Sequence, residues 1–241
     1  MNILDTNSQK GYPSTFNGLL KLVAKLRGPD GCPWDQKQTR ETFRNQFLEE
    51  TYELIDALDT GNSESICEES GDVLLHIAFQ IQLAKETDSF SETQVFKNII
   101  GKLINRHPHV FKGVKIEDEK HLLKNWDEIK RTEKNHSHYK SILDGMPKTM
   151  SSLSTSQKIQ SRVARVNFDF EDLDGVLNKI SEEISEFNKS KTDFDKEHEL
   201  GDVLFSIVNL CRWNNVDAES ALRKSYKRFE KRFKGIKKIG K

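Results

Sequence analysis

This 241-residue sequence has few of the features that mark secreted, disulfide-bonded or membrane proteins. Its three cysteines, Cys32, Cys67 and Cys211, are far apart and form no C-x-x-C pair, which argues against a zinc knuckle or a disulfide framework. No apolar run approaches the roughly 20 residues that cross a bilayer, and residues 1–10 lack the basic and apolar regions of a signal peptide. We therefore expect a protein of the reducing cytoplasm with no membrane partner.

A charge excess and the common phosphate-binding loops are also missing. Lys plus Arg and Asp plus Glu both number 38, so the net charge gives no reason to expect a nucleic acid partner. Neither G-x-x-x-x-G-K-[ST] nor G-x-G-x-x-G occurs, so a bound nucleotide would be held by a metal and by side chains.

Helical patterns fill most of the chain, and no segment shows the sustained period-two alternation of a strand. In the first half, caps and breakers predict four helices. The first is capped by Ser14 or Thr15 and ends at Gly28-Pro29, and the second runs over about 39–59. The third is capped by Ser63 and runs to about 86, and the fourth runs from a Ser91/Gln94 capping box to Pro108. Four more are predicted over about 150–166, 172–190, 195–213 and 217–237. The expected fold is all-α: two tandem four-helix domains, residues 1–113 and 146–241, joined by a polar helical linker over 114–145.

An internal repeat carries the most informative residues. Glu69-Ser70-Gly71-Asp72 reappears 130 positions later as Glu199-Leu200-Gly201-Asp202, each followed by an apolar helix. Each copy also follows a second acidic cluster, Glu49-Glu50-x-x-Glu53 or Glu182-Glu183-x-x-Glu186. Burying carboxylates without partners is costly, so the repeat indicates two copies of a metal site.

Helix geometry explains how such a site is built. Residues three apart share a helix face, so Glu50 and Glu53 project together, and antiparallel packing would bring Glu69 and Asp72 beside them. Glu183, Glu186, Glu199 and Asp202 repeat this arrangement. Oxygen donors alone favour Mg²⁺, with Mn²⁺ as the alternative. A di-iron site would need Glu-x-x-His on core helices, and the only match, Glu133/His136, falls in the linker.

Such a metal cluster can activate water and stabilise a leaving phosphate, and an anionic substrate also needs cations nearby. Lys224, Arg228 and Arg232 lie along one flank of an apolar stripe in the last predicted helix, formed by Leu222, Tyr226, Phe229 and Phe233. These basic residues are candidates for phosphate binding.

The sequence resembles the tandem-domain form of the MazG nucleoside triphosphate pyrophosphohydrolases over nearly its whole length. The motifs that carry the resemblance are Gly31-Cys32-Pro33-Trp34-Asp35, Leu48-Glu49-Glu50-Thr51-Tyr52-Glu53, Glu69-x-Gly71-Asp72, Arg106-His107-Pro108-His109-Val110-Phe111, Asn125-Trp126, Gln157-Lys158-Ile159-Gln160, Glu199-x-Gly201-Asp202 and Phe229-Glu230-x-Arg232-Phe233. Where relatives often read Gly-Phe-Asp-Trp, this chain has Asn167-Phe168-Asp169-Phe170.

The resemblance implies an all-α, Mg²⁺-dependent homodimer that splits a nucleoside triphosphate into the monophosphate and pyrophosphate. It places the metal ligands at Glu183, Glu186, Glu199 and Asp202, with Glu50, Glu53, Glu69 and Asp72 as the first-domain set, and credits the C-terminal domain with hydrolysis. Glu182 and Glu183 are then the catalytic candidates. Lys158, Phe170, Lys224, Arg228 and Arg232 are the candidates for substrate contact.

The expected mechanism is in-line attack of a metal-activated water with pyrophosphate as the leaving group. Two alternatives remain open at this stage. One is a hydrolase of a narrower phosphoanhydride, such as dUTP or phosphoribosyl-ATP. The other is a non-catalytic helical scaffold that binds nucleotide as a signal.

Overall fold

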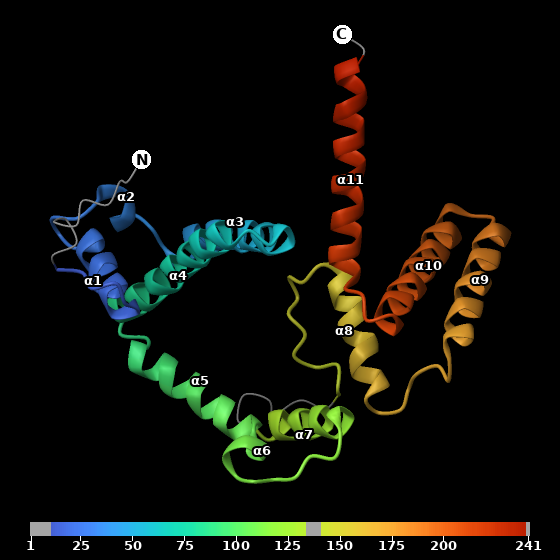
Figure 1. Cartoon of the computed structure of the whole chain (residues 1–241), viewed down its shortest axis with the longest axis horizontal. Helices are drawn as coiled ribbons and strands as arrows, with labels where there is room; N and C mark the ends of the chain where they lie inside the picture. Colours follow the sequence, from blue (N-terminus) through green and yellow to red (C-terminus); the bar gives the residue numbers. More distant parts are fainter. Residues whose placement is uncertain (1–10, 134–140, 240–241) are drawn as a thin grey trace. The chain divides into compact units, whose positions relative to one another are not determined.

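The computed structural model of the chain describes residues 11–133 and 141–239, and within them it is all-α, with eleven helices and no strand (Figure 1). This confirms the predicted fold class. Contacts divide the chain after Ile104 into an N-terminal unit and a C-terminal unit. Part of the predicted linker, residues 134–140 with His136, lies outside the described residues.

Helices α1 (Phe16–Arg27), α2 (Pro33–Gln36), α3 (Arg40–Thr60), α4 (Ser63–Glu86) and α5 (Glu92–Arg106) begin in the N-terminal half. Thr15 caps α1 as predicted, and Ser91 and Gln94 form the predicted reciprocal pair at the start of α5. The cap of α4 was predicted wrongly: Asn62, not Ser63, accepts from the first backbone amides. Asn is among the strongest N-caps, so it takes the position over its neighbour.

The turn between α3 and α4 depends on Gly61, which ends α3 with a φ of 70°. Only glycine adopts this left-handed conformation at little cost, and the turn lets α4 return along α3. The core of the N-terminal unit lies where α1 joins this pair: Val23, Phe43, Ala78 and Phe79 are each at most 2% exposed. Burying a Phe side chain contributes roughly 1.5–3 kcal/mol, so the two rings are main determinants of this packing.

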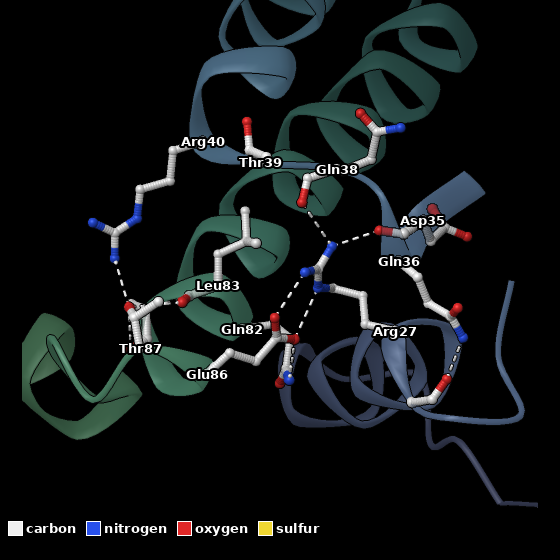
Figure 2. Close-up of polar contacts among 12 residues, drawn as sticks. Arg27, Asp35, Gln36, Gln38, Thr39, Arg40, Gln82, Leu83, Glu86 and Thr87 are labelled. Atoms are coloured by element: carbon white, nitrogen blue, oxygen red, sulfur yellow. Dashed lines mark hydrogen bonds and ion pairs between the residues drawn. The ribbon is translucent and has the colours of Figure 1, made fainter. Parts of the chain in front are cut away.

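Polar contacts tie the loop over 28–38 to the core (Figure 2). Arg27 donates to both carboxylate oxygens of Glu86, at 2.8 and 2.7 Å, and to the backbone carbonyls of Asp35 and Gln38, at 2.5 and 3.1 Å. A planar guanidinium with five donors can join three chain segments in this way. The Arg27 side chain is only 7% exposed, so these contacts hold α1, α2 and the end of α4 together.

The remaining helices are α6 (Pro108–Phe111), α7 (Glu119–Thr132), α8 (Ser152–Ala164), α9 (Leu173–Lys189), α10 (Asp193–Trp213) and α11 (Ala218–Ile239). The four predicted helices of the second domain are confirmed to within three residues at each end. Within the C-terminal unit α10 packs against α8 and α9, whereas α11 contacts α8 and α10 near its start and then extends beyond them (Figure 1).

None of the helices within 11–133 and 141–239 combines the length and the apolar character needed to cross a membrane.

Candidate active site

Three predicted metal ligands of the N-terminal unit meet between α3 and α4. Glu50 and Glu53 come from α3 and Glu69 from α4, and each offers a carboxylate oxygen within 4.8 Å of the other two. Asp72 lies one turn further along α4, close enough to raise the pKa of both Glu50 and Glu69 by its negative charge. The structure therefore brings the four predicted acids of this unit together.

The electrostatics of this cluster favour a cation. Burial raises the pKa of Glu50, and the charges of Asp72, Glu53 and Glu69 raise it further. Burial also raises the pKa of Glu69, followed by the charges of Glu53 and Asp72, and its Oε2 is buried without a hydrogen-bond partner. Mutually repelling carboxylates with an unpaired buried oxygen are what a hard divalent ion would neutralise, so the residues fit Mg²⁺.

In the C-terminal unit, Glu183 and Glu186 of α9 meet Glu199 of α10, again with carboxylate oxygens within 4.8 Å of one another. Glu183 is buried, at 5% exposed. Asp202 also lies on α10, where one of its oxygens is 3.3 Å from Nδ1 of His198, and His198 Nδ1 is 3.7 Å from Glu199. The structure therefore groups Glu183, Glu186 and Glu199, and it places Asp202 in a second group that shares Glu199 and includes His198.

Lys179 belongs to this site but was not predicted from the sequence. Its Nζ lies 2.8 Å from Glu183 Oε1 and 3.0 Å from Glu182 Oε1. The hydrogen bond to Glu183, then that to Glu182, holds the pKa of Lys179 far above its ordinary value. The i,i+4 spacing from Lys179 to Glu183 was a visible signal, but the same pattern is common on solvated helix faces.

A pocket of about 630 Å³ opens beside the C-terminal acids. A volume of this size is typical of small-ligand sites. The pocket's wall combines apolar side chains with a few polar groups from α8, α9, α10 and the segment over 167–170: Ile159, Gln160, Val163, Asn167, Phe168, Asp169, Phe170, Val176, Lys179, Glu183, Asp202, Phe205, Ser206, Asn209 and Arg212. Metal-ligand candidates and an apolar cavity therefore share one site.

The segment over 167–170 forms one wall of the pocket. Asn167 has a φ of 63°, the left-handed conformation that Asn tolerates better than most residues and that Gly adopts freely. Asp169 then anchors the segment to α10, since Arg212 Nη2 and Trp213 Nε1 donate to its Oδ1 at 2.5 and 3.1 Å. Phe170, a predicted substrate contact, lines the pocket next to it.

Two positions of the pocket wall hold different types of residue in the N-terminal unit. Val176 and Asn209 line the pocket seven residues before Glu183 and seven after Asp202. The corresponding positions relative to Glu50 and Asp72 hold Phe43 and Phe79, whose rings stack at a centroid distance of 4.3 Å. Each of these rings is 2% exposed. Aromatic side chains thus stand at the positions that correspond to two residues of the C-terminal pocket wall.

The predicted basic contacts are not brought to the acids in the described part of the chain. Lys224, Arg228 and Arg232 are exposed along α11, and none of them lines the pocket. Lys158 is exposed on α8, two residues before Gln160, which does line it. The roles of these four residues in substrate binding stay predictions.

Known proteins are similar to this chain over most of its length. Residues 38–111 match the MazG nucleotide pyrophosphohydrolase domain. A protein of Thermotoga maritima named nucleoside triphosphate pyrophosphohydrolase/pyrophosphatase MazG is 42% identical over 93% of this chain and 86% of its own length. The chain belongs to the MazG family. This confirms the resemblance noted from the sequence.

Two further relatives show how widely the MazG sequence pattern extends. The nucleoside triphosphate pyrophosphohydrolase of Escherichia coli K12 is 39% identical over 92% of this chain and 86% of its own length. The protein YabN of Bacillus subtilis is 41% identical over 94% of this chain, which covers 47% of that longer protein. This MazG protein thus aligns with relatives across both of its units.

Proposed function

We propose that the C-terminal unit hydrolyses nucleoside triphosphates to the monophosphate and pyrophosphate in the presence of Mg²⁺. The observation that supports this most directly is that Glu183 and Asp202 line the same pocket as Phe170 and other apolar side chains. A nucleoside needs the apolar cavity, and its phosphate chain needs the metal at the acids. Membership of the MazG family and the names of the relatives support the same reaction.

The residues that would hold Mg²⁺ are Glu183, Glu186, Glu199 and Asp202, with Mn²⁺ as an alternative ion. When bound, the metal would lower the pKa of a coordinated water and stabilise negative charge on the phosphates. Glu50, Glu53, Glu69 and Asp72 are proposed as a second metal site in the N-terminal unit.

The side chains around the acids have separate parts in the reaction. Attack of water on the α-phosphorus breaks its bond to the bridging oxygen, and pyrophosphate leaves with that oxygen. We propose that Glu182, whose side chain is 55% exposed and 3.0 Å from Lys179, accepts the proton that the attacking water loses. Lys179 carries its positive charge between Glu182 and Glu183 and balances charge at the same place.

A turnover screen with pyrophosphate detection tests the proposal. We expect Mg²⁺-dependent release from several nucleoside triphosphates, and a loss of at least 100-fold in kcat for Glu183→Gln or Asp202→Asn with unchanged helicity. The matched variants Glu50→Gln and Asp72→Asn should retain turnover, since their unit has Phe43 and Phe79 where Val176 and Asn209 line the C-terminal pocket. Full activity in both C-terminal variants would refute the assignment.

The same screen separates the alternatives. Turnover restricted to dUTP or phosphoribosyl-ATP would favour the narrower hydrolase. Tight Mg²⁺-dependent nucleotide binding without pyrophosphate release would favour the non-catalytic scaffold.

We also propose that the protein is a cytoplasmic homodimer. Free thiols at Cys32, Cys67 and Cys211 suit a reducing compartment. The predicted stripe of α11 is exposed, with Tyr226 at 54% and Phe229 at 68%. Contiguous apolar faces of this kind are usually covered by a partner, and a second copy of the chain is the partner that the family resemblance implies.

A further inference from the structure

Gln160 is the most deeply buried polar side chain on the wall of the C-terminal pocket other than Glu183, at 5% exposed. Its Nε2 donates a 2.8 Å hydrogen bond to the backbone carbonyl of Phe205. Its Oε1 is buried and has no hydrogen-bond partner. A buried acceptor left unpaired costs about 1–3 kcal/mol, so this oxygen calls for an explanation.

The orientation of the amide follows from its neighbour. A backbone carbonyl can only accept, so the nitrogen of Gln160 must face Phe205 and the oxygen must face away from it. Exchange of the two amide atoms would set one oxygen against another and is therefore disfavoured. The amide of Gln160, a residue of the pocket wall, is thus fixed with its unpaired oxygen turned away from the Phe205 carbonyl.

A donor lies on the same pocket wall. Asn209 is 8% exposed, and its Oδ1 accepts a 2.9 Å hydrogen bond from Nε of Arg212. This bond directs the Asn209 amide nitrogen away from Arg212, and Asn209 lines the same pocket as Gln160. An acceptor and a donor on a mostly apolar wall match the paired donor and acceptor on the Watson–Crick edge of a nucleobase.

We propose that Gln160 Oε1 accepts a hydrogen bond from an N–H group on the Watson–Crick edge of the substrate's base, with Asn209 as the adjacent donor. This inference rests on the proposed nucleotide hydrolysis and adds the residue that selects the substrate. The requirement is for a donor on the base, so a base that lacks one leaves the buried oxygen unpaired. Sites that hydrogen-bond a substrate reject analogues without the matching group more strongly than apolar pockets reject a change of size.

The test compares ATP with purine riboside triphosphate, which differs only by lacking the amino group and has no N–H on that edge. We expect wild-type protein to show a kcat/KM at least about tenfold lower for the analogue, as the loss of one buried hydrogen bond predicts. Gln160→Met keeps the side chain's length and removes the acceptor. It should lower kcat/KM for ATP by about tenfold and bring the ratio of the two substrates near one.

Gln157→Met is the matched control. Gln157 lies one turn earlier on α8 and outside the pocket lining, with both ends of its amide paired, to the Val216 carbonyl and to the Ala218 amide. The Gln157→Met variant should have the wild-type ratio of kcat/KM for ATP to kcat/KM for the analogue. Equal kcat/KM for the two triphosphates in wild-type protein would overturn the proposal, even if Gln160→Met fails to fold.

Calorimetry separates this inference from the proposed function. If no triphosphate releases pyrophosphate, the hydrolysis proposal fails, while binding of AMP and of purine riboside monophosphate still tests the contact. Dissociation constants about tenfold apart would support the role of Gln160, and equal constants would overturn it.

Discussion

Lys179 donates from Nζ to Glu183 Oε1 across 2.8 Å, so a lysine ammonium neutralises the one predicted metal ligand that is buried in the C-terminal unit. The hydrogen bond to Glu183 is the main reason that the pKa of Lys179 is raised, which keeps the lysine charged at any physiological pH. A divalent ion at the same carboxylate therefore meets a neighbouring positive charge.

Lys179→Met should strengthen metal binding at the C-terminal cluster and weaken substrate binding. Removing the positive charge relieves about 1 kcal/mol of repulsion in this partly solvated site, or roughly a fivefold tighter Mn²⁺ dissociation constant. Calorimetric Mn²⁺ titration of protein carrying Glu50→Gln and Glu69→Gln isolates this site. The exposed Lys189→Met on the same helix is the control. An unchanged Mn²⁺ affinity in Lys179→Met would contradict the expectation.

Divalent metal should stabilise the N-terminal unit at neutral pH. Burial and neighbouring carboxylates raise the pKa values of Glu50 and Glu69 above 4.5, so without metal the folded state favours their protonated forms. That stabilisation is present at low pH and is lost as the pH rises from 4.5 through the raised pKa values. Mg²⁺ should then raise Tm at pH 7 and raise it less at pH 5, where protons compete. At 100 times its dissociation constant it contributes about 2.7 kcal/mol.

Glu69→Gln should separate the effect of carboxylate repulsion on Tm from the effect of Mg²⁺ binding in calorimetric scans. It removes one repelling charge, so the metal-free variant should melt higher than wild-type protein at pH 7 while losing most of the Mg²⁺ response. Glu68→Gln, at an exposed neighbouring position, should keep that response. A full Mg²⁺ response in Glu69→Gln would show that the ion binds elsewhere.

The sequence was sufficient to predict features that depend on residues close together in the chain, such as helix caps and shared helix faces. Thr15 and the pair Ser91/Gln94 predict helix starts because their side chains bond to the first backbone amides. Acids three residues apart share a helix face, so their grouping was also predictable. Helices α2 and α6 were not predicted because four residues carry no periodicity. The start of α4 was misplaced because Asn62 and Ser63 are both good caps.

The C-terminal pocket could not be predicted from sequence patterns. Phe43 and Val176 are both apolar helix positions and both are buried, yet Val176 also lines a cavity. The difference depends on side chains from other helices, such as Phe79 against Asn209. The unpaired oxygen of Gln160 likewise follows from its contact with Phe205, 45 residues away.

Arg27 and Glu86 should contribute stability that depends on pH. The hydrogen bond from Arg27 lowers the pKa of Glu86 below 4.5, so the stabilisation is present above that pH and is lost as the pH falls through the lowered pKa. Arg27→Met should cost about 2–3 kcal/mol at pH 7, because the side chain is buried and serves three segments. Glu86→Gln, at a more exposed carboxylate, should cost about 1 kcal/mol.

Urea unfolding at pH 7 and at about pH 4 measures both effects. The difference between wild type and Glu86→Gln should shrink at the lower pH, because below about 4.5 the unfolded wild-type chain binds a proton at Glu86 more readily than the folded ion pair does. Lys21→Met on the exposed face of α1 is the control. A pH-independent difference would contradict an ionic contribution.

The apolar face of α11 should mediate self-association. The double variant Phe229→Glu/Phe233→Glu places two charges on the stripe and should convert a dimer into a monomer with unchanged helicity. Light scattering coupled to gel filtration reports the mass. Lys231→Glu introduces a glutamate at another exposed position of the same helix and should leave the mass unchanged. A monomeric mass for the wild-type protein would contradict the proposed homodimer.

The stacked rings of Phe43 and Phe79 record how two copies of one ancestral unit diverged. After a gene duplicates, one copy can keep the ancestral reaction while the other is free to exchange ligand access for a tighter interior. The N-terminal unit nevertheless keeps Glu50, Glu53, Glu69 and Asp72 together, so its candidate cation site lies beside stacked rings and not beside a wall like that of the C-terminal pocket.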